Sequence, residues 1–158
     1  MKHWMAATIC LVWLAGCAAP SSRAVARRFS TYGQRSGTDL WHWLDEHPLP
    51  PDRTQEIVEL YRTGRSSLHI VQIRYLEQPH LHELHDVMVL LKQGRGTLHV
   101  GPQLRPLRSG SVTKVLRGVP HAFVNESVEP AVVFVAFTPP YDGHDIVFVD
   151  PSEISAWR

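Results

Sequence analysis

Three histidines in two separate stretches of the chain have side chains suited to binding a transition metal. His80 and His82 are two residues apart. In a β-strand such residues point to the same face, so both imidazoles can approach one ion. His121 lies in a second stretch, residues 110–125. Imidazole suits Zn, Cu, Ni and Fe(II), whereas histidines disfavour Mg and Ca. These residues are therefore candidate ligands of a divalent transition metal (Fe, Zn, Ni, Cu or Mn).

The two stretches resemble the two signature motifs of the cupin superfamily, whose members are small double-sheet β-barrels. The matching residues are His80, His82 and Gly94 in the first motif, and Gly110, Gly118, His121 and Asn125 in the second. The resemblance covers roughly the last two thirds of the chain. It implies an all-β double-stranded β-helix, a jelly-roll-like barrel, and members of the superfamily commonly dimerise.

Three positions depart from the cupin motifs. The opening glycine is Arg74, the proline position holds Leu116, and the usual metal-binding glutamate is replaced by Val87. Because valine has no lone pair, a fourth ligand must come from elsewhere. The nearest substitutes are His85 and Asp86, and strand alternation places His85 on the face of Val87. His85 is therefore the better candidate for a fourth ligand.

An alternative stays open for these residues. His85 and Asp86 then either support the ligands from behind through hydrogen bonds or lie at the surface. We expect Asn125 to bond backbone groups, or groups behind the ligands, rather than the metal.

Short segments rich in β-branched and aromatic residues predict strands, with turn residues between them. They cover residues 56–62, 67–75, 87–92, 97–100, 104–107, 111–116, 122–125, 131–137 and 146–149. We therefore predict a barrel over residues 56–150 and a tail over 151–158. A polar, aromatic loop at residues 138–145 either borders the barrel mouth or simply connects two strands.

One helix precedes the predicted barrel, within a segment of residues 38–55. Thr38 or Asp39 can cap a helix over residues 40–46, which the prolines of residues 47–51 then end. Leu40, Trp43 and Leu44 share one face of this helix, so we expect that face to pack on the barrel.

The N-terminus has the pattern of a secretory signal, with a basic start, an apolar middle and small residues before a cysteine. Residues 14–17, Leu-Ala-Gly-Cys, resemble the lipobox of bacterial lipoproteins. The resemblance implies a signal peptide over residues 1–16, lipidation of Cys17 with acyl chains such as palmitate, and a tether over residues 17–37. An ordinary secretory signal and an uncleaved apolar anchor are the alternatives. Ala18 after the cysteine implies the periplasmic face of the outer membrane.

Composition limits the other classes of function. The chain has 158 residues, of which 44% are hydrophobic and 20% charged, as expected for one globular domain. It contains 16 Lys and Arg against 15 Asp and Glu. This balance provides no basic field, so we expect no nucleic-acid partner.

Two functions are compatible with these features. In the first, a metalloenzyme binds water, oxygen or a small substrate at the open positions of a three-histidine metal. Thiol dioxygenases are similar in ligand type, since they use three histidines and no glutamate. In the second, the barrel binds a small ligand or a cell-wall fragment without chemistry. No partnered nucleophile is visible outside the histidines, so the sequence leaves the choice open.

The lipoprotein interpretation makes a direct prediction. Cys17→Ser removes the lipid attachment site, so the protein should leave the membrane fraction and accumulate as an unprocessed or differently cut precursor. Cell fractionation with immunoblotting measures both effects. Unchanged membrane attachment would rule out the lipoprotein interpretation.

Overall fold

The structure is a computed structural model that describes residues 39–153. Its elements are α2 (Leu40–Glu46), β1 (Gln55–Arg62), β2 (Ser67–Ile73), β3 (His80–His82), β4 (Asp86–Gln93), β5 (Arg95–Val100), β6 (Gln103–Arg108), β7 (Val112–Val115), β8 (His121–Asn125), β9 (Ala131–Thr138), β10 (Ile146–Phe148) and a final 3-10 helix (Pro151–Glu153). The predictions for the signal peptide, Cys17 and the tether lie outside the described residues. No helix in the described part is long and apolar enough to cross a membrane.

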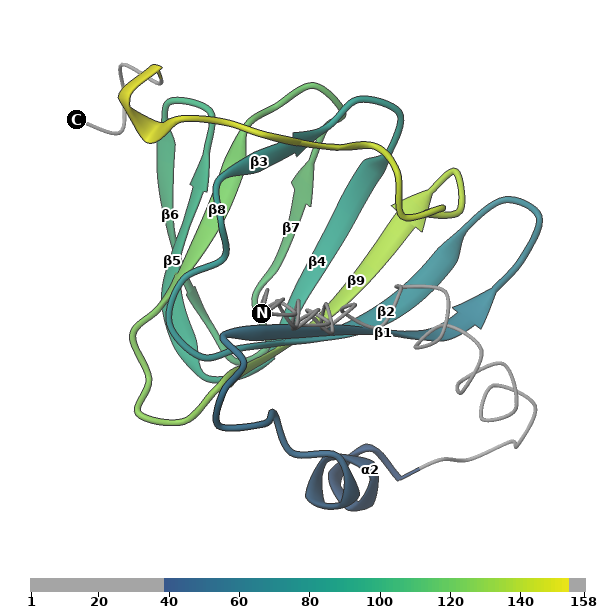
Figure 1. The fold of residues 1–158 in the computed structure, drawn as a ribbon, viewed down its shortest axis with the longest axis vertical. Coiled ribbons are helices and arrows are strands. Elements are labelled where there is room, and N and C mark those ends of the chain that lie inside the picture. The colour runs from purple at the N-terminus through teal and green to yellow at the C-terminus, as the bar shows by residue number, and fades with distance from the viewer. Residues whose placement is uncertain (1–38, 154–158) are drawn as a thin grey trace, which may run out of the picture.

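Two five-stranded antiparallel sheets face each other and form the barrel (Figure 1). One sheet has the strand order β1-β2-β9-β4-β7 and the other has β10-β3-β8-β5-β6. The predicted all-β double-stranded β-helix is confirmed. All the predicted strands are present with shifted ends, and β3 is an additional short strand.

Alternation along the strands directs apolar side chains into the space between the sheets. In β4, Val87 and Leu91 are buried, whereas Met88 between them is exposed. The buried core contains Val71, Ile73, Val87, Leu91, Leu98, Val100, Leu107, Val115, Phe123, Ala131, Val133, Val135 and Phe137. The inward direction predicted for Val87 is therefore correct.

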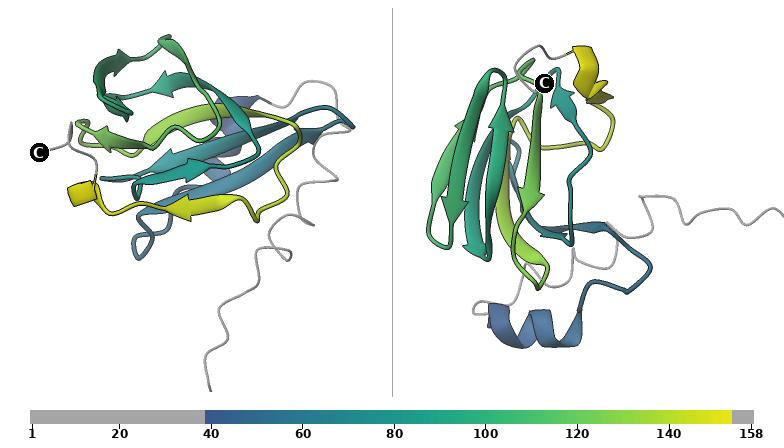
Figure 2. Two further views of the ribbon diagram at one scale, coloured as in Figure 1. Left: turned by 90° about the horizontal axis from the view of Figure 1, so that it is seen from above. Right: turned by 90° about the vertical axis from the view of Figure 1, so that its left-hand side faces the viewer.

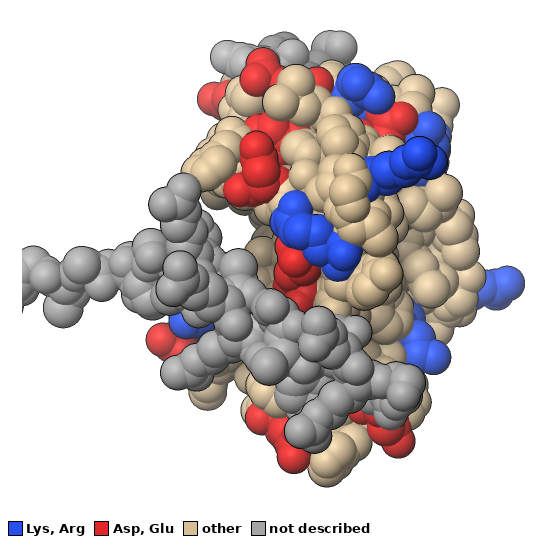
Figure 3. Space-filling view, turned by 90° about the vertical axis from the view of Figure 1, so that its right-hand side faces the viewer, with Lys and Arg blue, Asp and Glu red and all other residues tan. Residues whose placement is uncertain are grey.

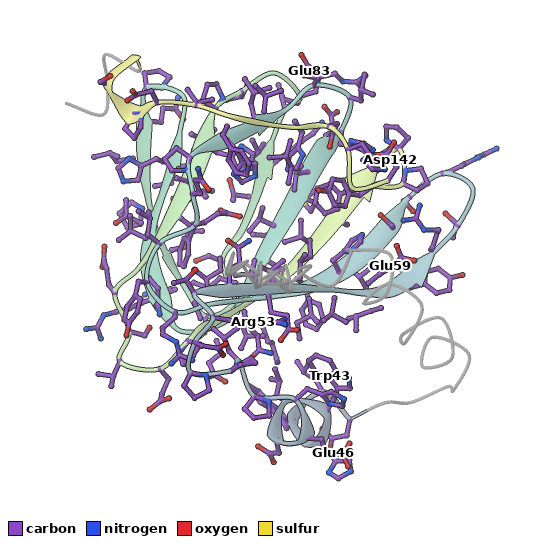
Figure 4. The ribbon with its side chains drawn as sticks, viewed as in Figure 1. Trp43, Glu46, Arg53, Glu59, Glu83 and Asp142 are labelled. Carbon is purple, nitrogen blue, oxygen red and sulfur yellow. The ribbon has the colours of Figure 1, made fainter. Side chains whose placement is uncertain are left out.

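Helix α2 covers the outer face of the first sheet (Figures 1 and 2). The side chain of Asp39 accepts a hydrogen bond from the backbone N–H of Trp41 at 2.9 Å, which makes Asp39 the N-cap. Trp43 lies between helix and sheet (Figure 4), packed with Val58 and Ile70. Strand β2 is thus buried on both faces, and its inner face is held toward the interior.

Strand β3 places two of the candidate ligands. It lies between β10 and β8, and its register sets His80 directly opposite His121 on β8. The i, i+2 relation assumed for His80 and His82 holds, since both are buried while Leu81 between them is less so. The pairing of β3 with β8 therefore brings together histidines that are far apart in sequence.

Candidate metal centre

The three predicted ligands form one buried cluster. The ring centroids of His80 and His121 are 4.3 Å apart, those of His80 and His82 are 5.0 Å apart, and those of His82 and His121 are 5.4 Å apart. One ring nitrogen from each histidine lies within 4.8 Å of the other two. The structure thus brings together the three residues that the sequence identified.

The tautomers of two of these rings follow from their hydrogen bonds. Nδ1 of His80 lies 2.8 Å from the carbonyl oxygen of Gln78, and Nδ1 of His121 lies 3.1 Å from that of Val119. Because a carbonyl oxygen only accepts, each Nδ1 must carry the proton. In the neutral ring Nε2 then keeps its lone pair, which is the arrangement that a metal ligand requires.

The third ring, His82, is oriented by a carboxylate. Its Nδ1 lies 3.1 Å from Oδ1 of Asp145, so it donates to an acidic group rather than to a carbonyl. Burial lowers the pKa of His82, although the hydrogen bond to Asp145 opposes this effect. Burial, with the nearby His80, lowers the pKa of His121 to about 3. His82 and His121 therefore favour the neutral form that binds metal.

The sequence analysis did not identify Asp145. Its side chain is buried and also accepts from the backbone N–H of Leu84 at 3.3 Å and from Nδ1 of His85. Burial alone raises the pKa of Asp145, but the hydrogen bonds from His85 and His82 outweigh it, and the pKa lies below its ordinary value. The polar loop at 138–145 was the only sequence signal that pointed near this residue.

The structure does not place His85 as a fourth ligand beside the three histidines. Both of its ring nitrogens face acceptors, Nδ1 toward Asp145 and Nε2 toward the carbonyl oxygen of Pro140 at 3.2 Å. His85 precedes β4, which begins at Asp86, and its bond to Asp145 matches the alternative in which it supports the ligands from behind. His85 instead joins the β3–β4 connection to the loop of residues 138–145.

Two residues expected to support the ligands have other partners. Asp86 accepts from the backbone N–H of Arg117 at 3.1 Å and pairs with Lys114 at 3.2 Å, on the outer face of its sheet. Asn125 donates to three backbone carbonyls and accepts from the N–H of Ser127 at 2.9 Å. The contacts of Asp86 match the surface alternative rather than a role behind the ligands, while those of Asn125 match the backbone alternative.

The cluster lies in the wall of a cavity of roughly 220 Å³ between the sheets. Val87 lines the same cavity. The position that usually holds a glutamate therefore faces the cavity that the three histidines also line. The loop of residues 138–145 borders it as well, because Tyr141 lines the cavity and stacks on Phe137 with centroids 4.6 Å apart. Burial raises the pKa of Tyr141 to about 12, so its hydroxyl stays protonated.

Most of the cavity lining is apolar. Within residues 39–153, the lining includes no Lys or Arg, and Glu77 provides its carboxyl group. Burial raises the pKa of Glu77. Ile57, Ile146 and Phe148 line the cavity and are also exposed, which marks the mouth at β1 and β10.

The buried histidines predict that acid destabilises the metal-free protein. An unfolded histidine has a pKa near 6.5, whereas His121 and the buried His69 have folded values of about 3 and about 4. Below pH ~6.5 the unfolded state binds more protons, so stability falls toward pH 4 by up to about 1.4 kcal/mol per pH unit for each histidine.

Urea unfolding between pH 7.5 and pH 5, in the presence of chelator, measures this slope. His121→Asn should make the slope smaller by about one histidine's share. A slope equal to that of the parent protein would show that His121 titrates normally in the folded state.

Comparison with known proteins finds a cupin-domain match within the barrel. The family described as "Cupin domain" matches residues 69–137. An uncharacterised protein of Aquifex aeolicus is 33% identical over 95 residues, which is 60% of this chain and 78% of that protein.

Solved structures show the same fold. A Klebsiella pneumoniae protein with a double-stranded β-helix domain matches with a TM-score of 0.60 at 16% identity, covering 74% of this chain and 99% of that one. Pac13 of Streptomyces, solved with uridine, matches with a TM-score of 0.53 at 11% identity, covering 61% of this chain and 78% of that one. Residues 69–137 thus match a cupin domain, and the solved structures share its double-stranded β-helix fold, which supports the resemblance to the cupin superfamily.

Proposed function

We propose that this protein is a metal-dependent cupin that acts on a small, mostly apolar molecule. His80, His82 and His121 would bind a divalent transition metal through Nε2. The observation that carries the proposal is the hydrogen bonding of the three buried rings, since each Nδ1 faces an acceptor and each Nε2 is left for a ligand.

Three histidine ligands suit an active metal site. Catalytic metal sites in proteins commonly have three protein ligands and an open position for water or substrate. A metal bound here would supply Lewis-acid chemistry or, if it is iron, oxygen chemistry. The likeness in ligand type to thiol dioxygenases favours oxygen chemistry, and the apolar walls around the histidines would exclude bulk water from the reacting atoms.

The lining of the cavity indicates the class of substrate. Without Lys or Arg among the described lining residues, an anionic molecule would find no cation except the metal. The walls instead suit a neutral, mostly apolar molecule with one oxygen or similar donor atom that reaches the histidine wall. Pac13, which has the same fold, was solved with uridine, a small neutral molecule, and this supports a small neutral ligand here.

A non-catalytic binding module is the second candidate. It is favoured by the scarcity of polar groups, because outside the histidine cluster the cavity's polar side chains are Gln55, Glu77, Gln78 and Tyr141. Such a lining can bind a ligand but offers few groups for proton transfer. Turnover of a bound molecule would separate the enzyme from the binding module.

We also propose that the protein is anchored in the cell envelope by lipid on Cys17. The lipobox at residues 14–17 supports this location. The surface face in Figure 3 carries both acidic and basic side chains. The anchored protein would act on molecules that enter the periplasm.

Metal analysis tests the proposed function. Mass spectrometry of the mildly purified protein should detect about one equivalent of transition metal per chain. His121→Ala should lose that metal, whereas His144→Gln, which changes an exposed histidine, should keep it. A parent protein that binds no metal after incubation with Fe, Zn, Ni, Cu and Mn would overturn the proposal.

The stability of Val87→Glu should depend on whether metal is bound in the cavity. A buried carboxyl group without a partner should cost the metal-free variant about 1–3 kcal/mol. Bound metal should pair with the new carboxylate, so the melting temperature should rise more on metal addition than in the parent. Thermal unfolding with and without each metal measures both effects.

Val133→Glu is the matched control for this variant. In the pairing of β4 with β9, Val87 is opposite Phe137 and Val133 is opposite Leu91, so Val133 lies further along the same sheet. Its carboxylate should destabilise the protein whether or not metal is present. If Val87→Glu behaves in the same way, residue 87 does not face a metal.

A further inference from the structure

We propose that Asp145 is a positioning residue for the metal centre and supplies, through His82, the negative charge that Val87 fails to provide. The inference rests on the proposed function, because it needs a metal bound to His80, His82 and His121. It assigns a role to a residue that lies outside both cupin motifs.

The need for such a residue follows from the composition of the ligand set. The buried cluster of His80, His82 and His121 contains no carboxylate, and the glutamate position is a valine that is 2% exposed. Three imidazoles provide no anionic ligand for a divalent cation, and burial raises the pKa of Glu77, whose carboxyl group also lines the cavity. A buried cation is costly unless an anion lies nearby.

Asp145 is placed to provide that anion. Its side chain is 2% exposed and its Oδ1 accepts from Nδ1 of His82 at 3.1 Å. A carboxylate behind a ligand histidine fixes the ring orientation and makes Nε2 more basic. His80 and His121 donate to backbone carbonyls instead. Of the three described ligands, His82 is therefore the one whose ring donates a hydrogen bond to a carboxylate.

Further contacts hold the carboxylate in position. Oδ2 of Asp145 accepts from the N–H of Leu84 at 3.3 Å and from His85 Nδ1. Nε2 of His85 lies 3.2 Å from the carbonyl oxygen of Pro140. These bonds tie the carboxylate to the β3–β4 connection and to the loop that carries Tyr141.

The hydrogen bond between Asp145 and His82 links the loop of residues 138–145 to the proposed metal site. Residues 138–145 follow β9 and lead into β10, which pairs with β3 (Figure 1). The same loop presents Tyr141 to the cavity and Asp145 to His82. A docked loop therefore completes the cavity wall and the support of the metal ligand together.

A second metal ion is the competing interpretation. Ligating atoms of His82, His85 and Asp145 also lie within 4.8 Å of one another. The hydrogen bonds of Asp145 account for this closeness without an ion, so we expect one metal per chain. Two equivalents of metal, with one of them lost in His85→Gln, would overturn the assignment of Asp145.

The test compares three variants of the full protein by competition with a chelator for Co²⁺ and Zn²⁺. Asp145→Ala removes both hydrogen bond and charge, and should weaken metal binding about 10- to 100-fold. Asp145→Asn keeps an oxygen that accepts from His82 but loses the charge, so its affinity should lie between those of Asp145→Ala and the parent. Asp142→Ala alters an exposed carboxylate of the same loop (Figure 4), and should leave affinity unchanged.

Two readouts separate positioning from a general loss of structure. The visible spectrum of bound Co²⁺ should change in Asp145→Ala, because the geometry of His82 changes. Adding Val87→Glu to Asp145→Ala should restore affinity, because it returns a carboxylate to the metal. Circular dichroism of the metal-free variants checks that each is folded.

The outcomes distinguish the two proposals. A parent protein without metal binding would overturn the proposed function and this inference with it. A metal-binding parent with a folded Asp145→Ala of equal affinity and spectrum would overturn the role of Asp145 alone. If Asp145→Ala does not fold, Asp145→Asn remains the test. A metal affinity of Asp145→Asn equal to that of the parent would overturn the claim that Asp145 supplies negative charge to the metal centre.

Discussion

The pairing of β3 with β8 is the contact on which the candidate site depends. Strand β3 has three residues, and one register pair with β8 sets His80 against His121. Because cross-strand partners point to the same face of a sheet, this pair also fixes the direction of His82, two residues further on. The remaining strands provide a rigid frame around it, with β10 on the other side of β3.

Buried histidines in an apolar barrel must find partners, and these partners decide their chemistry. Each Nδ1 in the cluster has an acceptor of its own, and burial keeps His121 neutral. An imidazole that is neutral, fixed in one tautomer and held by packing is prepared for a metal before any metal arrives. The stability of the fold and the readiness of the site therefore have the same structural cause.

The loss of the usual glutamate changes how charge reaches the centre. Val87 extends the apolar wall, which enlarges the surface open to a neutral ligand. The buried carboxylate of Asp145 lies one side chain further away and is linked to His82 by a hydrogen bond. If the site binds a metal as we propose, a carboxylate behind His82 would leave more of the coordination sphere open to a small molecule than a direct glutamate ligand would.

Much of this protein follows from its sequence. The period of two along β4 predicted the inward face of Val87 and Leu91, and the turn glycines separated strands that the structure confirms. The spacing of His80 and His82 and the second motif with His121 identified the cluster, since local geometry and motif position suffice for it. Asp39, the observed N-cap, was one of two predicted candidates beside Thr38, because capping depends on a few neighbouring residues.

Only the tertiary structure decided the partners behind the ligands. Asp145 contacts His82 from a loop 63 residues away, and no local pattern specifies such a contact. Strand alternation could not decide between a ligand role and a supporting role for His85, whose ring nitrogens face Asp145 and the carbonyl oxygen of Pro140. Strand periodicity acts over neighbouring residues, whereas the choice of hydrogen-bond partners depends on how the chain closes in space.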